Sequence, residues 1–87
     1  MTYTDHLATA STLAPVVERV HGKNHPELTR VRELTEAIAE AQNPAAVAEL
    51  FGELRSITDD YAIPADACEG FTAAYDALQA ADRAQAS

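Results

Sequence analysis

Apolar residues recur every three or four positions along most of this chain, and this spacing is the feature that most limits its fold. The first series consists of Leu7, Ala10, Leu13, Ala14, Val17 and Val20. Such spacing places side chains on one face of an α-helix, whereas a β-strand needs apolar and polar residues in alternation. No window alternates in that way, and the three glycines are scattered and not paired in hairpin turns. We therefore predict an all-α fold, a small four-helix up-down bundle.

Helix-breaking residues between the apolar series mark the expected helix ends. The chain is expected to form one domain with helices at about 4–22, 25–42, 44–58 and 64–84. In the first helix, Thr4 is the expected N-cap and Gly22 the residue that ends the helix. Pro15 lies inside it, where the proline ring removes one backbone donor. Because the apolar face keeps its phase across Pro15, we expect a kink at this residue and not a break.

The starts of the second and third helices have their own capping signals. Asn24, with Glu27 three residues later and Pro26 between them, has the pattern of a capping box with proline in the first turn. Asn43 followed by Pro44 predicts an N-cap and a first helical residue. Because the connection before the third helix is so short, the second and third helices should be antiparallel neighbours.

The fourth helix is expected to begin at Pro64, after a loop over residues 58–63 that has no helical phase. Tyr61 and Ile63 are the apolar residues expected to hold this loop on the core. The last turns of the fourth helix have almost nothing large to bury, so we expect them to fray unless a second subunit covers them. A chain this short also buries a small fraction of its surface. Both points favour a homodimer or a protein partner.

The charge of the chain excludes several classes of partner. Fourteen acidic and six basic side chains give a formal net charge of −8. Nucleic-acid binding needs clustered Lys and Arg, and an anionic membrane surface would repel this charge. No apolar run approaches the roughly 20 residues that span a bilayer, and residues 1–11 lack the pattern of a secretory signal. We expect a cytoplasmic protein that binds neither nucleic acid nor membranes.

The candidate catalytic groups are few. Cys68 is the single cysteine, so it forms no internal disulfide. We expect it to be a small buried residue of the fourth helix, and the alternatives are a reactive thiol or a bridge between two chains. No basic group adjoins it in the sequence to activate the thiol. Asp59 and Asp60 fall in a loop, where adjacent acids usually face solvent. The sequence has no catalytic motif, and we predict no catalytic residue.

Three histidines, His6, His21 and His25, are the weak metal-ligand candidates. Metal sites in helix bundles use inward-facing Glu and His, but none of the apolar faces contains an acidic residue. His6 and His21 lie fifteen residues apart, about 22 Å along a helix, so one ion cannot bridge them within a chain. His21 and His25 can approach each other across Gly22, yet two imidazoles alone form a weak, open site. We therefore interpret this pair mainly as a helix end and a turn.

Two stretches of the chain resemble a known family. Residues 17–28, VERVHGKNHPEL, and residues 54–68, LRSITDDYAIPADAC, occur in the order found in the Ric (repair of iron centres) proteins, a hemerythrin-like family linked to mending iron–sulfur clusters. The positions that carry the resemblance are His21, Gly22, Asn24, His25, Pro26, Glu27, Leu28, Pro64, Ala67, Cys68 and Tyr75. The resemblance implies a four-helix bundle and a non-haem di-iron centre with histidine and glutamate ligands. Iron is therefore the one cofactor that the resemblance suggests, and the residues by themselves predict none.

The chain also departs from this family at the expected ligand positions. The family's second helix continues into a His-x-x-x-Glu segment, whereas this chain turns at residues 42–44. Residues 45–50 lack the histidine expected early in the third helix, and residues 84–87 lack the final His-x-x-x-Glu pair. In the family pattern the motif containing His21 and His25 is remote from the metal. The resemblance therefore implies a truncated hemerythrin-like bundle without the di-iron site.

Three functions remain open from the sequence. The first is an accessory or protein-binding role in iron–sulfur cluster repair or in the response to nitrosative and oxidative stress. The second is a metal site formed between subunits by His6, His21 or His25 with surface carboxylates. The third is a helical dimerisation scaffold unrelated to iron.

Overall fold

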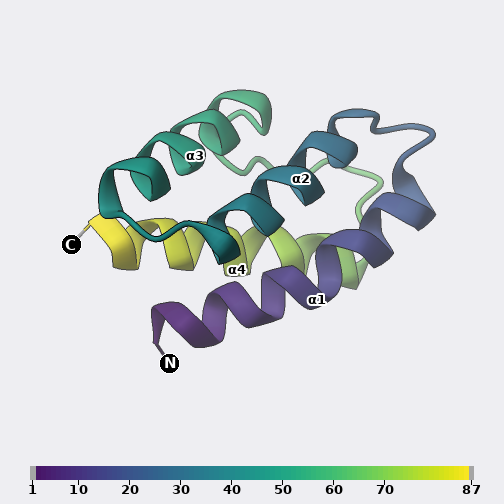
Figure 1. Cartoon of the computed structure of the whole chain (residues 1–87). Helices are drawn as coiled ribbons and strands as arrows, with labels where there is room; N and C mark the ends of the chain where they lie inside the picture. The colour runs from purple at the N-terminus through teal and green to yellow at the C-terminus, as the bar shows by residue number, and fades with distance from the viewer. Residues whose placement is uncertain (1, 87) are drawn as a thin grey trace.

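The computed structural model describes residues 2–86 as four α-helices joined by three connections (Figure 1). The helices are α1 (Tyr3–His21), α2 (Glu27–Glu40), α3 (Pro44–Ile57) and α4 (Glu69–Ala86). Within the described residues no strand is present. Successive helices run in opposite directions, and the start of α1 lies at the same end of the bundle as the end of α4 (Figure 1). The prediction of an all-α four-helix bundle is confirmed.

Each helix packs against two others. α1 contacts α2 and α4, and α3 contacts the same two helices, with the most extensive packing between α1 and α4. Small residues explain this close packing, since α1 buries Ala10 and Ala14 while α4 buries Ala74, Ala77 and Ala81. The largest fully buried apolar side chains come from α2, α3 and α4. They are Leu28, Val31, Leu34, Ile38, Phe51, Leu54, Phe71 and Leu78. Val20, expected on the apolar face of α1, is 65% exposed and lies outside the core.

The start of α1 differs from the prediction. Thr2 and not Thr4 is the N-cap: its hydroxyl accepts from the Asp5 backbone N–H at 3.2 Å. The Asp5 carboxylate accepts in return from the Thr2 backbone N–H at 3.1 Å, which completes a capping box. α1 then continues through the exposed Pro15 as one helix, so the helix is not broken there.

The junction between α1 and α2 is held by backbone groups instead of the predicted capping box. α2 begins at Glu27, and no side chain caps it. The His21 carbonyl accepts from the backbone N–H groups of Asn24 and His25, at 3.1 and 2.9 Å, so a turn replaces the expected start of the helix at residue 25. Gly22 ends α1 as predicted, but with right-handed φ and ψ of −58° and −28°. Glycine is required at this position because it has no side chain. A Cβ on residue 22 would lie 2.4 Å from the Glu18 carbonyl oxygen.

The start of α3 follows the sequence signal. The Asn43 side chain accepts from the Ala46 backbone N–H at 2.8 Å, and Pro44 occupies the first turn. α2 and α3 are packed neighbours, as their short connection predicts (Figure 1).

Both ends of α4 differ from expectation. The helix begins at Glu69 and not at Pro64, because the Pro64 carbonyl accepts from the Ala67 N–H at 3.1 Å in a turn. At its other end α4 remains helical to Ala86, with Ala81 and Asp82 buried. Contacts within the chain therefore cover Ala81 and Asp82, whereas Arg83, Ala84 and Ala86 are exposed.

A buried carboxylate explains why the end of α4 is packed. The Asp82 side chain is 7% exposed and accepts from Arg55 Nη1 at 2.6 Å, from the Tyr61 hydroxyl at 2.8 Å and from the Gln85 amide at 3.1 Å. Burial, and then the bond to Asp82, raise the pKa of Tyr61 above its ordinary value of 10.0. These contacts tie α3, the following connection and α4 together.

The connection at Tyr61 has an unusual backbone. Asp59, Asp60 and Tyr61 have φ values of 53°, 58° and 63°, a left-handed conformation that costs roughly 1–2 kcal/mol for each such residue. The Thr58 hydroxyl accepts from the Tyr61 N–H at 2.9 Å, and the Tyr61 ring is buried. The predicted loop is therefore held by Tyr61, whereas Ile63 is 43% exposed and does not hold it. Asp59 and Asp60 are exposed, as predicted.

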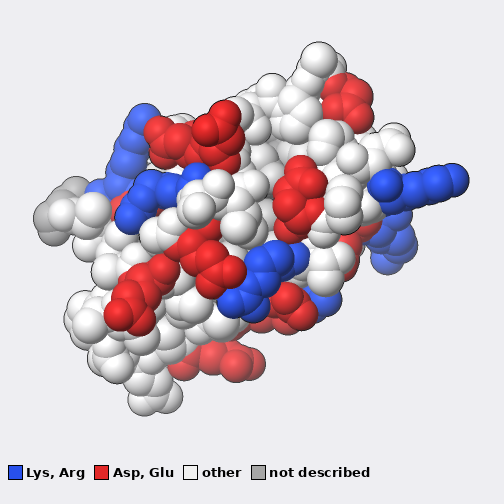
Figure 2. Space-filling view, turned by 90° about the horizontal axis from the view of Figure 1, so that it is seen from above, with Lys and Arg blue, Asp and Glu red and all other residues white. Residues whose placement is uncertain are grey.

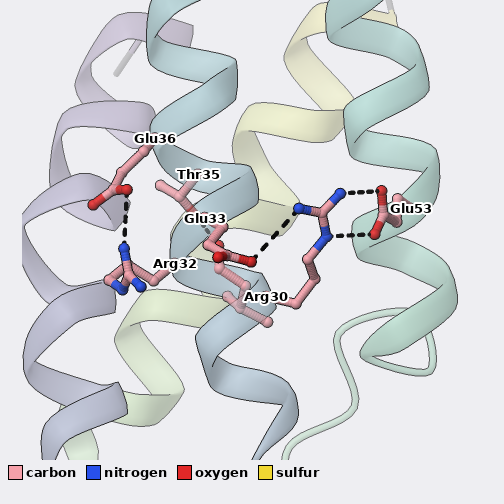
Figure 3. Close-up of polar contacts among 7 residues, drawn as sticks. Arg30, Arg32, Glu33, Thr35, Glu36 and Glu53 are labelled. Carbon is pink, nitrogen blue, oxygen red and sulfur yellow. Dashed lines mark hydrogen bonds and ion pairs between the residues drawn. The ribbon is translucent and has the colours of Figure 1, made fainter.

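Charged side chains of both signs alternate on the surface formed by α2 and α3 (Figure 2). Arg30 of α2 binds Glu53 of α3 through two bonds of 2.7 and 2.9 Å (Figure 3). Arg32 binds Glu36, four residues later in α2, at 3.0 Å, and it also binds Glu18 of α1 at 2.6 Å. Arg30 with Glu53 and Arg32 with Glu18 thus join α2 to both of its neighbours.

Over residues 2–86, no helix combines the length and the apolar character that crossing a membrane requires.

Gly22→Ala should destabilise the fold by about 1–3 kcal/mol, because the added Cβ would overlap the Glu18 carbonyl oxygen. The free energy of unfolding from urea titration measures this effect. Gly52→Ala is the matched control: its Cβ would meet only the Arg55 side chain, at an ordinary 3.6 Å. Because alanine is favoured over glycine inside a helix, that variant should gain about 0.5–1 kcal/mol. Equal effects of the two substitutions would contradict the role given to Gly22.

Candidate functional site

Polar side chains from two distant stretches meet where α1 ends and α4 begins. We call His21, His25, Asp66, Cys68 and Phe71 the junction cluster. The two histidines lie at the end of α1 and in the turn after it, and the other three lie in and just beyond the connection before α4. The α1 end and the α4 start adjoin each other (Figure 1) because these helices are antiparallel and closely packed.

His21 and Cys68 form the first pair of the cluster. His21 Nε2 lies 3.1 Å from Cys68 Sγ, although the two residues are 47 positions apart. Cys68 is exposed, so the prediction of a buried cysteine is wrong. The reason is that α4 begins one residue later, and the neighbouring Ala67 packs against the core instead. A basic group absent from the local sequence thus adjoins the thiol in space.

His25 and Asp66 form the second pair. His25 Nε2 donates to both Asp66 oxygens, at 2.9 and 3.0 Å, and His25 Nδ1 lies 3.3 Å from Glu27 Oε2. Because carboxylates only accept, this arrangement suits an imidazolium with both nitrogens protonated. The bond to Asp66 is the main cause that raises the pKa of His25, and the same bond lowers the pKa of Asp66.

Phe71 forms the floor of the cluster. The rings of His21 and His25 meet it edge-on, with centroid distances of 5.2 and 5.3 Å, and Phe71 itself is fully buried. The Tyr75 ring also meets Phe71 edge-on, with a centroid distance of 4.9 Å, and burial raises the pKa of Tyr75 to about 12. Edge-to-face contacts fix ring orientation, so Phe71 helps to direct each imidazole towards its partner.

The structure brings together two of the three candidate metal ligands. The ring centroids of His21 and His25 are 6.5 Å apart, whereas His6 lies near the other end of α1. Within residues 2–86, no three His, Cys, Asp or Glu side chains are grouped to hold a metal ion. His21 faces a thiol and His25 faces carboxylates, so the two histidines have different roles.

The remaining positions of the family resemblance have structural roles. Leu28 and Tyr75 belong to the core, and Ala67 packs against it. Asn24 and Pro26 are exposed in the turn between α1 and α2. Pro64 is part of the turn before α4, and Gly22 permits the close approach to Glu18.

The interior of the bundle does not fit the di-iron centre that the resemblance implies. Asp82 is the single acidic side chain buried among residues 2–86, and no histidine of that range is buried. The Asp82 oxygens already accept from Arg55, Tyr61 and Gln85. Iron ligation would remove these bonds, and neighbouring carboxylates to complete a site are absent from the described core.

A groove of about 560 Å³ opens at the end of the bundle away from the junction cluster. Its walls come from the start of α1, the end of α2 and the start of α3, with Tyr3, Leu7 and Ile38 among them. Among its described lining residues there is no His, Cys, Asp or Glu. These lining residues therefore offer no acid–base pair.

Asp66→Asn should lower the pKa of His25 towards its ordinary value of 6.5, because the largest cause of the rise is removed. An NMR titration of the His25 ring protons measures this change. Asp59→Asn, which changes an exposed acid near the other end of the same connection, is the control and should leave that pKa unchanged. An unaltered His25 pKa in Asp66→Asn would contradict the geometry of the pair.

The same substitution should change how stability depends on pH. The raised pKa of His25 gives stability that is fully present below pH 6.5 and is lost as pH rises through the raised value. The lowered pKa of Asp66 gives stability that is present above pH 3.8 and is lost as pH falls through the lowered value. The difference in unfolding free energy between the wild type and Asp66→Asn should therefore be largest between about pH 4 and 6.5.

Comparisons with known proteins add no relative: no family model, no curated protein and no solved structure matches the chain.

Proposed function

We propose that this chain is a short Ric-like bundle that acts in iron–sulfur cluster repair, or in the response to nitrosative and oxidative stress. Its role is that of an accessory or protein-binding module without a di-iron site of its own. The support is the contact between the two stretches that carry the resemblance. His21 with Cys68, and His25 with Asp66, join residues 17–28 to residues 54–68 in one cluster.

The junction cluster suits a binding module for two reasons. Cys68 and Asp66 are exposed and face solvent, while Phe71 beneath them is buried and holds the cluster in place. The net charge of −8 favours a partner with a basic surface, because complementary charge speeds encounter. We expect a protein partner and not a nucleic acid.

A deletion strain of the native host tests this function. After exposure to nitric oxide, an enzyme that depends on a [4Fe–4S] cluster should recover its activity more slowly without the chain than with it. Restoring the wild-type chain should restore the rate, His25→Gln should restore it incompletely, and His6→Gln should act as the wild type. Normal recovery in the deletion strain would contradict the proposal.

A second candidate is a metal site formed between two copies of the chain. The observation that favours it is the position of His21 Nε2 only 3.1 Å from the exposed Cys68 Sγ. Imidazole and thiolate are both zinc ligands, and two such pairs would supply the four ligands of a tetrahedral site. This role needs the dimer that the sequence predicts.

Elemental analysis and light scattering test the second candidate. Protein purified without chelator should hold one tightly bound metal ion for each dimer, and a chelator should return it to monomers. Cys68→Ser is the variant that should lose the metal, and His6→Gln is the matched control that should keep it. Less than one metal ion per dimer, or a monomer mass at every concentration, would exclude this candidate.

A further inference from the structure

The thiol of the junction cluster has the surroundings of a nucleophile. Cys68 is exposed, and His21 Nε2 lies 3.1 Å from its sulfur, within hydrogen-bond reach. A nucleophile and a base at this distance, with the base oriented by a third group, are typical of activated thiols. Here the third group is Phe71, whose buried ring meets the imidazole edge-on at 5.2 Å.

The start of α4 adds a second favourable feature. Cys68 directly precedes this 18-residue helix, and its carbonyl accepts from the Thr72 N–H at 3.0 Å. The sulfur lies over the first turn, since a Cβ on Gly70 would be 3.8 Å from it. Backbone N–H groups of a first turn favour negative charge close to them.

We propose that the exposed Cys68 thiol and the His21 imidazole together form a site for thiol–disulfide exchange, with a preference for small disulfides that carry positive charge. This activity does not depend on the proposed function, because it needs neither iron nor a partner protein.

The step balances without a further reactant. His21 Nε2 takes the thiol proton, and the Cys68 sulfur attacks one sulfur of the disulfide. One S–S bond forms between Cys68 and half of the reagent, while the S–S bond of the reagent breaks. The other half leaves as a thiolate and takes the proton from the imidazolium. Cys68 is oxidised to a mixed disulfide, and the leaving half is reduced to a thiol.

The preference for positive charge follows from the acids around the sulfur. Glu69 is the next residue and is exposed, and Asp66 lies close enough to His21 for their charges to interact. His25 balances only one of its two carboxylate partners, Glu27 and Asp66. With a net charge of −8 on the whole chain, an anionic disulfide is repelled and a cationic one is attracted.

Exchange rates of the full chain test the imidazole. With bis(2-hydroxyethyl) disulfide, which is neutral, and with a chelator present, His21→Gln should react about tenfold more slowly than the wild type. The appearance of the mixed disulfide by mass spectrometry gives the rate, and Cys68→Ser should give no adduct. His6→Gln, a histidine of the same helix far from the thiol, should react as the wild type does. Equal rates in folded His21→Gln and wild type would overturn the proposal.

A second measurement covers the case in which His21→Gln does not fold. The folded wild-type chain should react about tenfold faster with the neutral disulfide than the same chain unfolded in urea, where Cys68 has no imidazole beside it. An equal or slower rate in the folded chain would overturn the proposal without any variant.

Cystamine, which is cationic, and glutathione disulfide, which is anionic, test the preference. The rate of the chain with each disulfide is divided by the rate of 2-mercaptoethanol with the same disulfide, which removes the difference in intrinsic reactivity. At low salt, the normalised rate with cystamine should be about ten times the normalised rate with glutathione disulfide. This ratio of the two rates should fall as salt is added. Glu69→Gln should reduce this ratio. A ratio of one at low salt would contradict the stated preference.

Discussion

The buried carboxylate of Asp82 is the group on which the connection between α3 and α4 depends. A carboxylate that is 7% exposed is costly unless donors surround it, and Arg55, Tyr61 and Gln85 supply them. The position of Tyr61 in turn stabilises the left-handed backbone from residue 59 to residue 61. The chain therefore leaves α3 in a fixed direction, and residues 62–68 lead to the end of α1. The junction cluster depends on this path, since the connection carries Asp66 and Cys68 to the two histidines.

The sequence predicted the number and type of helices because apolar periodicity reports which face of a helix is buried. It also predicted the start of α3, where Asn43 and Pro44 act within three residues. It failed where contacts distant in sequence decide the local structure. Pro64 has the pattern of a first helical residue, but the path set by Tyr61 and the turn at Ala67 delay α4 to Glu69. The sequence near Asp82 does not indicate that this acid is buried, because its donors Arg55 and Tyr61 lie 27 and 21 positions earlier.

The candidate site was predicted only in part, for the same reason. The spacing of His21 and His25 identified both residues, since a turn at Gly22 brings them together. Nothing near Cys68 in the sequence indicates an imidazole, because His21 is 47 residues away and the α1–α4 packing alone brings them into contact. The sequence did contain one signal for this site, because the two stretches that carry the family resemblance are the same two stretches that meet in the junction cluster.

The two histidines illustrate how position within one turn separates chemical roles. His25 follows the end of α1 and lies between Glu27 and Asp66, so its positive charge is held by carboxylates and it fastens the connection to the bundle. His21 is the last residue of α1, and its ring contacts the same Phe71 ring. Its Nε2 faces the Cys68 thiol instead of a carboxylate. Because the His25–Asp66 pair holds the connection in place, Cys68 keeps its position beside His21. The structural histidine thus maintains the geometry on which the reactive pair depends.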